Sequence, residues 1–410
     1  MYLAHLSLTN FRNYSRLELD LEPGITLLQG ANAQGKTNFL EAIAYLATSR
    51  SLLASAEREL VNWLAWEEPL PFARLAGELA VDGRRRKIEI ALVANGGGGQ
   101  RLRKEVRING VPRRALDLVG QLPTVLFLPQ DINLVAGPPA ERRRYLDIAL
   151  CQMQADYCRT LSLYNKVLVQ RNALLRSLRD RGGPLDQLAY WDEQLIACGS
   201  LLVARRAAFV VALEQEASQR QAALTEGREW LQLRYIPRLT LAPDGEGDEE
   251  EPIADDEEGE GLWLREPSAA YETGEAAAVA EALRRELTRA RRQEIAAGMS
   301  LIGPHRDDVQ FLAQGRSLRT YGSRGQQRTA ALAVKLAEVA VMRQALGAAP
   351  LLLLDDVMSE LDARRRSTLL AALEGVTQAV VTTTDWDDFS EEFRRRAHCL
   401  QVEGGRVQRV

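Results

Sequence analysis

A glycine-rich loop near the N-terminus, GANAQGKT at residues 30–37, constrains the fold more than any other feature of this chain. The apolar run at 24–29 before it is typical of a buried strand, and the apolar spacing over 39–46 is typical of a helix. Glycines between a strand and a helix let backbone N–H groups close around an anion at the positive helix terminus. The spacing therefore predicts a phosphate-binding loop rather than a plain glycine-rich turn.

Two side chains of this loop have expected roles in binding a nucleoside triphosphate. Lys36 is expected to reach the β- and γ-phosphates, and the Thr37 hydroxyl to hold Mg²⁺. A chance match is rarer than usual here, because lysine occurs only five times in the chain. The residues that we expect to contact the nucleotide are Gly30, Asn32, Gly35, Lys36, Thr37 and Asn38.

A metal-binding carboxylate is expected at the end of a second strand, PLLLLDD at 350–356. Four consecutive leucines are typical of a strand that is buried on both faces, and this strand delivers Asp355 at its carboxyl end. We expect Asp355 to hold Mg²⁺ together with Thr37, and Asp356 to orient or deprotonate the attacking water. The alternative is that these carboxylates cap the turn before the next helix.

A second anion-binding helix start is predicted at YGSRGQQRT, residues 321–329. In ABC-class ATPases such a motif grips the γ-phosphate of ATP held by the other subunit, so that nucleotide joins two heads. The residues expected to do so here are Ser323, Gly325 and Gln326. The sequence SELD at 359–362 follows the metal strand at the distance of a D-loop, which crosses the same interface.

The chain has the pattern of an α/β head that is interrupted by a helical lobe. Short apolar strands dominate to about residue 128, including 87–93 and 106–110, with a hairpin tip or flexible loop at 94–100. Leucines at seven-residue spacing then predict long antiparallel helices between 138 and 230, interrupted at 182–184. Further along we expect a helix at 281–297, a strand at 309–312 and a helix at 327–346. Two buried strands at 351–354 and 378–382, with a helix between them, are expected to end the chain.

Charge is unevenly distributed along the chain. Residues 244–260 hold 11 acids and no bases, whereas the net charge of the whole chain is only −4, so the remainder is mildly basic. Such a run is typical of a solvated, disordered insert, and the alternative is an internal mimic of nucleic acid that covers a basic surface. No apolar run approaches the length of a membrane span, so we expect a soluble, cytosolic protein.

Further motifs in a fixed order make the chain similar to a known family. They are LTNFRNY at 8–14, the loop at 30–43, FLPQD at 127–131, RRRYLD at 142–147, QRN at 170–172, GPHRDD at 303–308 and the serine motif at 323. Together they resemble the RecF family of bacterial recombination mediators, which belongs to the SMC-like branch of the ABC ATPases. The resemblance implies an α/β, ABC-type P-loop ATPase head of mixed β-sheet with flanking helices and an inserted helical lobe. Lobe I would comprise 1–125 and 347–410, and lobe II 126–346 with the acidic insert.

The resemblance also implies a function in DNA repair, recombination, replication restart and the SOS response. RecF proteins bind ATP and Mg²⁺, pair head to tail when ATP is bound, and bind double-stranded DNA near single-strand gaps and junctions. They act with RecR and RecO in loading the RecA recombinase. By resemblance we expect a cytoplasmic, nucleoid-associated protein without a membrane partner.

Three features depart from the family pattern. Asn32-Ala33 stands where Asn-Gly is usual, Gln130 stands where a glutamate is usual, and the acidic run at 244–260 has no counterpart. Alanine is strained at position 33 if the loop requires a positive φ there. None of the three removes an expected phosphate or metal ligand.

Hydrolysis is expected to be slow and to time the release of a dimer. ABC transporters carry a glutamate where this chain has Asp356, and a switch histidine that this chain lacks. Thr383 is our choice for the γ-phosphate contact in that region, and a hydroxyl is not a general base at neutral pH. A nucleotide-gated scaffold without catalysis is the alternative. A transport-type ATPase subunit is disfavoured because Lys36 and Asp355 lie so far apart in the chain.

Basic clusters occur at 84–87, 101–104, 142–144 and 284–292, and they could line a groove that contacts DNA phosphates. Each cluster could equally be a solvated helix face or a set of intramolecular ion pairs. No base-reading motif is present in the sequence, which favours contact with the DNA backbone irrespective of sequence.

Overall fold

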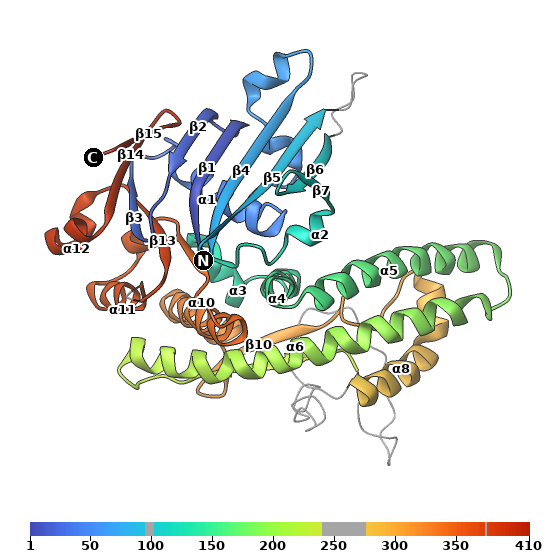
Figure 1. The fold of residues 1–410 in the computed structure, drawn as a ribbon. Helices are drawn as coiled ribbons and strands as arrows, with labels where there is room; N and C mark the ends of the chain where they lie inside the picture. Colours follow the sequence, from blue (N-terminus) through green and yellow to red (C-terminus); the bar gives the residue numbers. More distant parts are fainter. Residues whose placement is uncertain (95–101, 240–275, 374) are drawn as a thin grey trace.

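The computed structural model describes residues 1–94, 102–239, 276–373 and 375–410. Two six-stranded sheets, built from the N- and C-terminal parts of the chain, stack above a layer of helices, and a long helical arm extends from that layer (Figure 1). The predicted loop at 94–100 and the acidic run at 244–260 lie outside the described residues, apart from Ala94.

The central sheet is mixed and has the strand order β15-β14-β3-β13-β12-β8. Its strands are β3 (Gly24–Gln29), β8 (Thr124–Phe127), β12 (Leu351–Leu354), β13 (Gln378–Thr383), β14 (His398–Glu403) and β15 (Arg406–Arg409). All neighbours pair in parallel except β14 and β15. The predicted strands at 24–29, 351–354 and 378–382 are therefore confirmed.

The expectation that β13 would end the chain is wrong. Helix α12 (Glu391–Arg396) follows it, and β14 and β15 then add two strands beside β3. From Leu400 to Glu403, β14 alternates buried and exposed residues, and β15 is mostly exposed, so neither strand has the apolar run that marks β12.

The four leucines of β12 are buried on both faces of the sheet, as predicted. Leu351 and Leu353 join the core shared with the second sheet, whereas Leu352 and Leu354 join the core shared with the helical layer. Successive side chains of a strand point to opposite faces, so a strand between two cores must be apolar at every position.

The second sheet is antiparallel and has the order β2-β1-β4-β5-β6-β7. Its strands are β1 (Tyr2–Phe11), β2 (Tyr14–Asp20), β4 (Phe72–Val81), β5 (Arg84–Ala94), β6 (Leu102–Ile108) and β7 (Val111–Arg113). Helix α1 (Lys36–Thr48) lies between the two sheets and is buried over most of its length (Figure 1). This position fixes the helix start that carries the glycine-rich loop.

The helical part forms a layer and an arm. It comprises α4 (Pro139–Met153), α5 (Ala155–Arg181), α6 (Gln187–Thr225), α8 (Ala276–Ala297) and α10 (Arg324–Leu346), with a small sheet of β9 (Leu231–Ile236), β10 (Asp308–Ala313) and β11 (Arg316–Ser317). Helices α5 and α6 form the predicted antiparallel pair, which breaks at 182–184. The expectation that no apolar run approaches the length of a membrane span is wrong: an 18-residue stretch of α6 is apolar enough to cross a membrane, but 67% of it is buried inside the molecule. Burial between α5, α8 and α10 accounts for its composition.

Short elements connect these layers. They are η1 (Glu57–Leu60), η2 (Trp63–Glu67), α2 (Ala115–Leu118), η3 (Pro129–Ile132), α3 (Asn133–Ala136), α9 (Leu318–Tyr321), η4 (Val357–Glu360), α11 (Ala363–Leu373) and η5 (Trp386–Asp388). The lobe boundary predicted at residue 125 falls inside β8, which belongs to the central sheet. The division into lobes stays a prediction.

Candidate nucleotide-binding site

The glycine-rich loop and the carboxylate of the leucine strand meet at one edge of the central sheet. Because β3 and β12 run parallel on either side of β13, the segments that follow them leave the sheet at the same edge. There the Thr37 hydroxyl donates a hydrogen bond of 2.8 Å to Asp355 Oδ2. Two residues from nearly opposite ends of the chain are thus in contact, as the expected shared Mg²⁺ site requires.

The loop has the conformation of an anion-binding nest. Gly35 has a φ of 116° and Ala33 a φ of 66°, both in the left-handed region. A side chain at Gly30 would place its Cβ 2.6 Å from the carbonyl oxygen of Val402 on β14. Because Ala33 has a positive φ, the loop does require this conformation at position 33, and the alanine there is strained.

The Lys36 ammonium is held over the loop. The side chain is 7% exposed, and Nζ donates to the carbonyl oxygens of Gly30 at 2.5 Å and Ala31 at 3.0 Å. Burial lowers the pKa of Lys36, and the carboxylates of Asp356 and Asp355 oppose that shift. A cation confined above a nest of N–H groups is suited to the β- and γ-phosphates of a nucleotide.

The two carboxylates that follow β12, Asp355 and Asp356, differ in how fully they are bonded. Asp355 Oδ1 accepts a 3.0 Å hydrogen bond from the Thr382 hydroxyl, which leaves both of its oxygens engaged. Asp356 has a φ of 48°, and within the described part of the chain its buried Oδ1 has no hydrogen-bond partner. Burial raises the pKa of both carboxyls.

These residues fit a divalent cation. A strained residue with a buried, unpaired carboxylate oxygen requires a compensating charge or donor, and Mg²⁺ prefers hard oxygen ligands such as Thr37 and Asp355. Among the described residues no group of three or more His, Cys, Asp and Glu could hold a metal alone. Mg²⁺ usually takes one or two protein ligands together with phosphate oxygens and water, and Thr37 and Asp355 would supply two.

Thr383 is not brought into this group by its side chain. It is fully buried, and its hydroxyl donates to the Asp385 carbonyl oxygen and to Asp388 Oδ2, both at 2.8 Å. Its neighbour Thr382 faces Asp355 instead and also accepts from the Asp356 N–H at 2.9 Å. The γ-phosphate contact assigned to Thr383 stays a prediction that this geometry does not support. The sequence did not single out Thr382, whose hydroxyl contacts both Asp355 and the Asp356 N–H.

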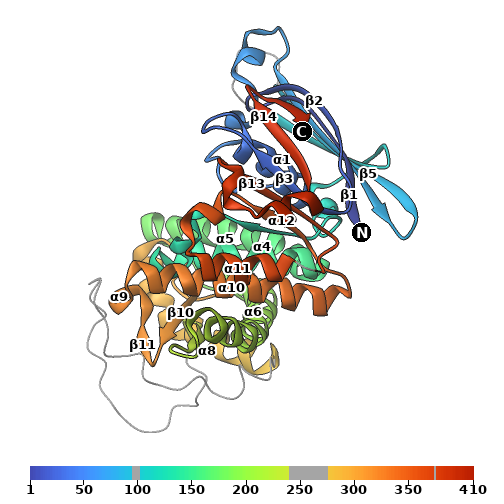
Figure 2. The same ribbon diagram turned by 90° about the vertical axis from the view of Figure 1, so that its left-hand side faces the viewer.

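The serine motif begins α10 in the helical layer, away from the glycine-rich loop of its own chain (Figure 2). Ser323 Oγ accepts from Gln326 N at 3.3 Å, and Gln326 Oε1 accepts from Ser323 N at 2.9 Å, which forms a capping box. Ser323 and Gly325 are exposed, and Gln326 also donates to Glu229 Oε1 at 2.8 Å. The helix start is therefore rigid and open to a second molecule.

The segment predicted as a D-loop is hydrogen-bonded to Asp356, which follows β12. Ser359 Oγ donates to the carbonyl oxygen of Asp356 at 2.8 Å, and Asp362 Oδ1 accepts from Arg365 N at the start of α11. Movement of the exposed Ser359 would therefore act directly on the backbone of Asp356.

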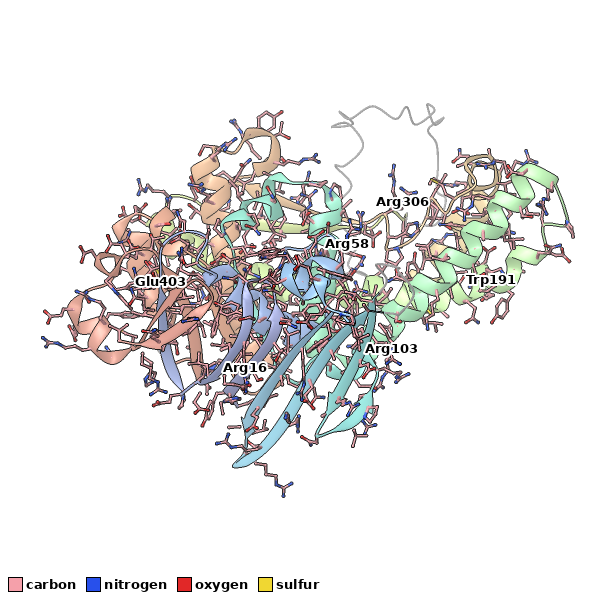
Figure 3. All side chains as sticks on the ribbon, turned by 90° about the horizontal axis from the view of Figure 1, so that it is seen from above. Arg16, Arg58, Arg103, Trp191, Arg306 and Glu403 are labelled. Carbon is pink, nitrogen blue, oxygen red and sulfur yellow. The ribbon has the colours of Figure 1, made fainter. Side chains whose placement is uncertain are left out.

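Many arginines of the basic clusters already have partners within the chain. Arg142 is 2% exposed and binds Asp308 through two guanidinium nitrogens, Arg143 donates to the Asp307 carbonyl oxygen, and Arg144 donates to that of Ser51. The cluster at 142–144 thus joins α4 to the loop before β10 and to residue 51. Arg58, Arg103 and Arg306 lie around the place where the arm leaves the body (Figure 3). Of these, Arg103 pairs with Glu105, and Arg306 donates to the Ser300 carbonyl oxygen.

Known proteins share both the sequence and the fold. Residues 2–406 match the family described as RecF/RecN/SMC N terminal domain. The DNA replication and repair protein RecF of Chloroflexus aurantiacus is 43% identical, and that of Roseiflexus castenholzii is 44% identical, each over 99% of both chains. The chain belongs to the RecF family. Members of this family carry the name DNA replication and repair protein, so the predicted function class is confirmed.

Solved RecF structures agree with this assignment. A recombination mediator protein RecF with ATP, described as part of the RecFOR pathway, is 30% identical, has a TM-score of 0.81 and covers 100% of this chain and 97% of its own. The Smc head domain of Pyrococcus furiosus, 15% identical with a TM-score of 0.50, shares the fold alone. The predicted ABC-type ATPase head of mixed sheet and flanking helices is therefore confirmed.

Proposed function

We propose that this RecF-family protein is a weak, Mg²⁺-dependent ATPase whose two copies pair head to tail on ATP and, when paired, bind double-stranded DNA near single-strand gaps and junctions. The observation that carries the proposal is the contact between Thr37 and Asp355, with an exposed, capped helix start at Ser323 elsewhere on the molecule. In this proposal, each of these two separate regions of the molecule supplies one half of a nucleotide site.

In this proposal Lys36 and the N–H groups of the loop neutralise the β- and γ-phosphates, and Thr37 and Asp355 hold Mg²⁺. When bound, Mg²⁺ would supply positive charge that stabilises the transferred phosphoryl group. Asp356 would orient the attacking water and accept its proton, because burial raises the pKa of its carboxyl and makes it a stronger base. Its side chain is one methylene shorter than the usual glutamate, which supports slow hydrolysis.

The partners proposed are RecR, acting with RecO, and double-stranded DNA, in a cytoplasmic protein associated with the nucleoid. The RecFOR pathway named for the RecF structure and the repair function of the family support these partners. The sequence contains no base-reading motif that would select a particular DNA sequence, so contact with the phosphate backbone is proposed. The alternative function is a nucleotide-gated scaffold without hydrolysis, which the engaged hydroxyl of Thr383 favours.

Sedimentation with ATP, with ADP and without nucleotide tests the pairing. Association should require ATP and be lost in Lys36→Met and Ser323→Arg. Ser390→Arg is the matched control, because Ser390 is also an exposed N-cap, its Oγ accepting from Phe393 N at 3.2 Å. An ATP-loaded protein that stays monomeric, or equal loss in both serine variants, would refute the role of the serine motif.

Phosphate release with and without DNA tests the catalytic part, with Asp355→Asn as the blank. Release that DNA stimulates and that Asp355→Asn abolishes is expected of the ATPase. A rate equal to that of the blank, with pairing intact, would instead favour the scaffold.

A further inference from the structure

Two turns outside the glycine-rich loop bind the same loop residue. The Gly404 N–H donates to Gln34 Oε1 at 2.7 Å, and the Gly405 N–H donates to the Gln34 carbonyl oxygen at 3.2 Å. Asn13 Nδ2, in the β1–β2 turn, donates to the same carbonyl oxygen at 2.9 Å. A carbonyl oxygen can accept two hydrogen bonds, so Gln34 is held by the β14–β15 turn and the β1–β2 turn together.

Asn13 also connects the loop to the first turn of α1. Its Oδ1 accepts from Asn38 Nδ2 at 2.8 Å, while the neighbouring Tyr14 hydroxyl donates to the Gly35 carbonyl oxygen at 2.9 Å. A side chain at Gly35 would place its Cβ 2.5 Å from Asn13 Nδ2. Glycine at 35 is therefore needed for the approach of Asn13 as well as for its positive φ.

The loop requires support of this kind. Ala33 and Gly35 hold left-handed conformations, and a strained segment keeps such a shape only when surrounding contacts impose it. A loop that is already shaped for phosphate binds more tightly, because less conformational entropy is lost on binding.

We propose that Asn13, Gly404 and Gly405 form a clamp around Gln34 that holds the phosphate-binding loop in its binding shape and thereby sets the affinity for ATP. These are positioning residues that act through the loop. Because β14 pairs with β3 and the last strand contacts β2, the clamp ties the loop to both sheets of the head. The proposal deepens the function proposed above and depends on ATP being the ligand of this loop.

Gly405→Ala and Gly404→Ala form a matched pair for testing the clamp. A Cβ at Gly405 would lie 2.4 Å from the Asn13 carbonyl oxygen, whereas a Cβ at Gly404 meets nothing within 4 Å. Both residues have a positive φ, of 77° and 54°, so both variants carry similar backbone strain. Only Gly405→Ala must push the turn away from Gln34.

Equilibrium binding of a fluorescent ATP analogue, with Mg²⁺ present, should show affinity about tenfold weaker for Gly405→Ala, the equivalent of about one lost hydrogen bond. Gly404→Ala should stay within about twofold of the unmodified chain. Phosphate release at saturating ATP should be nearly unchanged in both, because the clamp touches no reacting group. A generally destabilised protein would not show a raised KM with an unchanged kcat. The melting temperature of each variant without nucleotide would reveal such destabilisation.

Asn13→Ala provides a second route should Gly405→Ala fail to fold, and it is expected to weaken binding to a similar degree. Equal affinities in Gly405→Ala and Gly404→Ala, or unchanged affinity in Asn13→Ala, would overturn the clamp. If the unmodified chain itself binds no ATP, the proposed function fails instead, so the two failures are distinguishable.

Discussion

The arm contains a buried ion cluster whose disruption should have a large and specific cost. Arg171 of α5 is fully buried and donates from Nε to Asp192 Oδ1 at 2.8 Å, from Nη2 to Glu294 Oε2 at 2.6 Å, and from Nη1 to Ser300 Oγ at 2.7 Å. Its neighbour Asn172 accepts from both the N–H and the hydroxyl of Ser300. The family motif QRN at 170–172 thus joins α5 to α6 and to the end of α8.

Arg171→Leu should lower the free energy of unfolding by about 3–5 kcal/mol, because it leaves the carboxylate of Glu294, which is fully buried, without its cation. Asp192 is less affected, since Arg291 also binds it. With a urea m value of about 3 kcal/mol/M, the unfolding midpoint should fall by about 1–1.7 M. Circular dichroism at pH 7 would record the transition.

Two further variants isolate the cause. Arg220→Leu on α6 removes a half-buried i,i+4 pair with Glu216 and should cost only about 0.3–0.5 kcal/mol. Adding Glu294→Gln to Arg171→Leu removes the stranded charge, while the amide oxygen still accepts from Leu301 N, and should restore more than half of the loss. A double variant no more stable than Arg171→Leu, or an Arg171→Leu midpoint close to that of Arg220→Leu, would refute the reasoning.

Three other perturbations have defined outcomes. Ala33→Gly should raise the free energy of unfolding by about 1 kcal/mol by removing left-handed strain, measured by urea unfolding; a loss of stability would contradict the strain. Burial lowers the pKa of His305 to about 4. The contribution of His305 to stability is therefore present above pH 6.5 and is lost as pH falls toward 4. In His305→Asn, the free energy of unfolding should depend less on pH over this range. Thr382→Val should slow phosphate release because it frees Asp355, whereas Thr383→Val should mainly lower the melting temperature. If instead Thr383→Val slowed release and Thr382→Val did not, Thr383 would again be the candidate for the γ-phosphate contact.

The GPHRDD motif at 303–308 has a structural explanation in the same region. Arg206 of α6 donates to the Pro304 carbonyl oxygen at 2.6 Å, and Asp307 accepts from Arg238 N at 3.0 Å and from the Tyr235 hydroxyl. His305 Nδ1 lies 2.6 Å from the Tyr164 hydroxyl. These contacts join α5, α6 and β9, so this motif maintains the packing within the helical part.

The sequence by itself determined the elements whose signals are local. The glycine spacing at 30–37, the four leucines of β12 and the seven-residue repeats of α5 and α6 each depend on residues close together in the chain. Burial on two faces or along one helix stripe leaves few alternatives for such patterns. The parallel strands then bring Thr37 to Asp355 with no further information.

Only the tertiary structure decided which side chains face the site and which charges are free. Thr382 and Thr383 are chemically alike, and a shift of one residue in a strand exchanges its faces, so composition could not choose between them. The arginines of 142–144 find partners such as Asp308, more than 160 residues away, which no local pattern reveals. The position of the β14–β15 turn beside Gln34 is likewise set by the pairing of β14 with β3, which joins residues far apart in the chain.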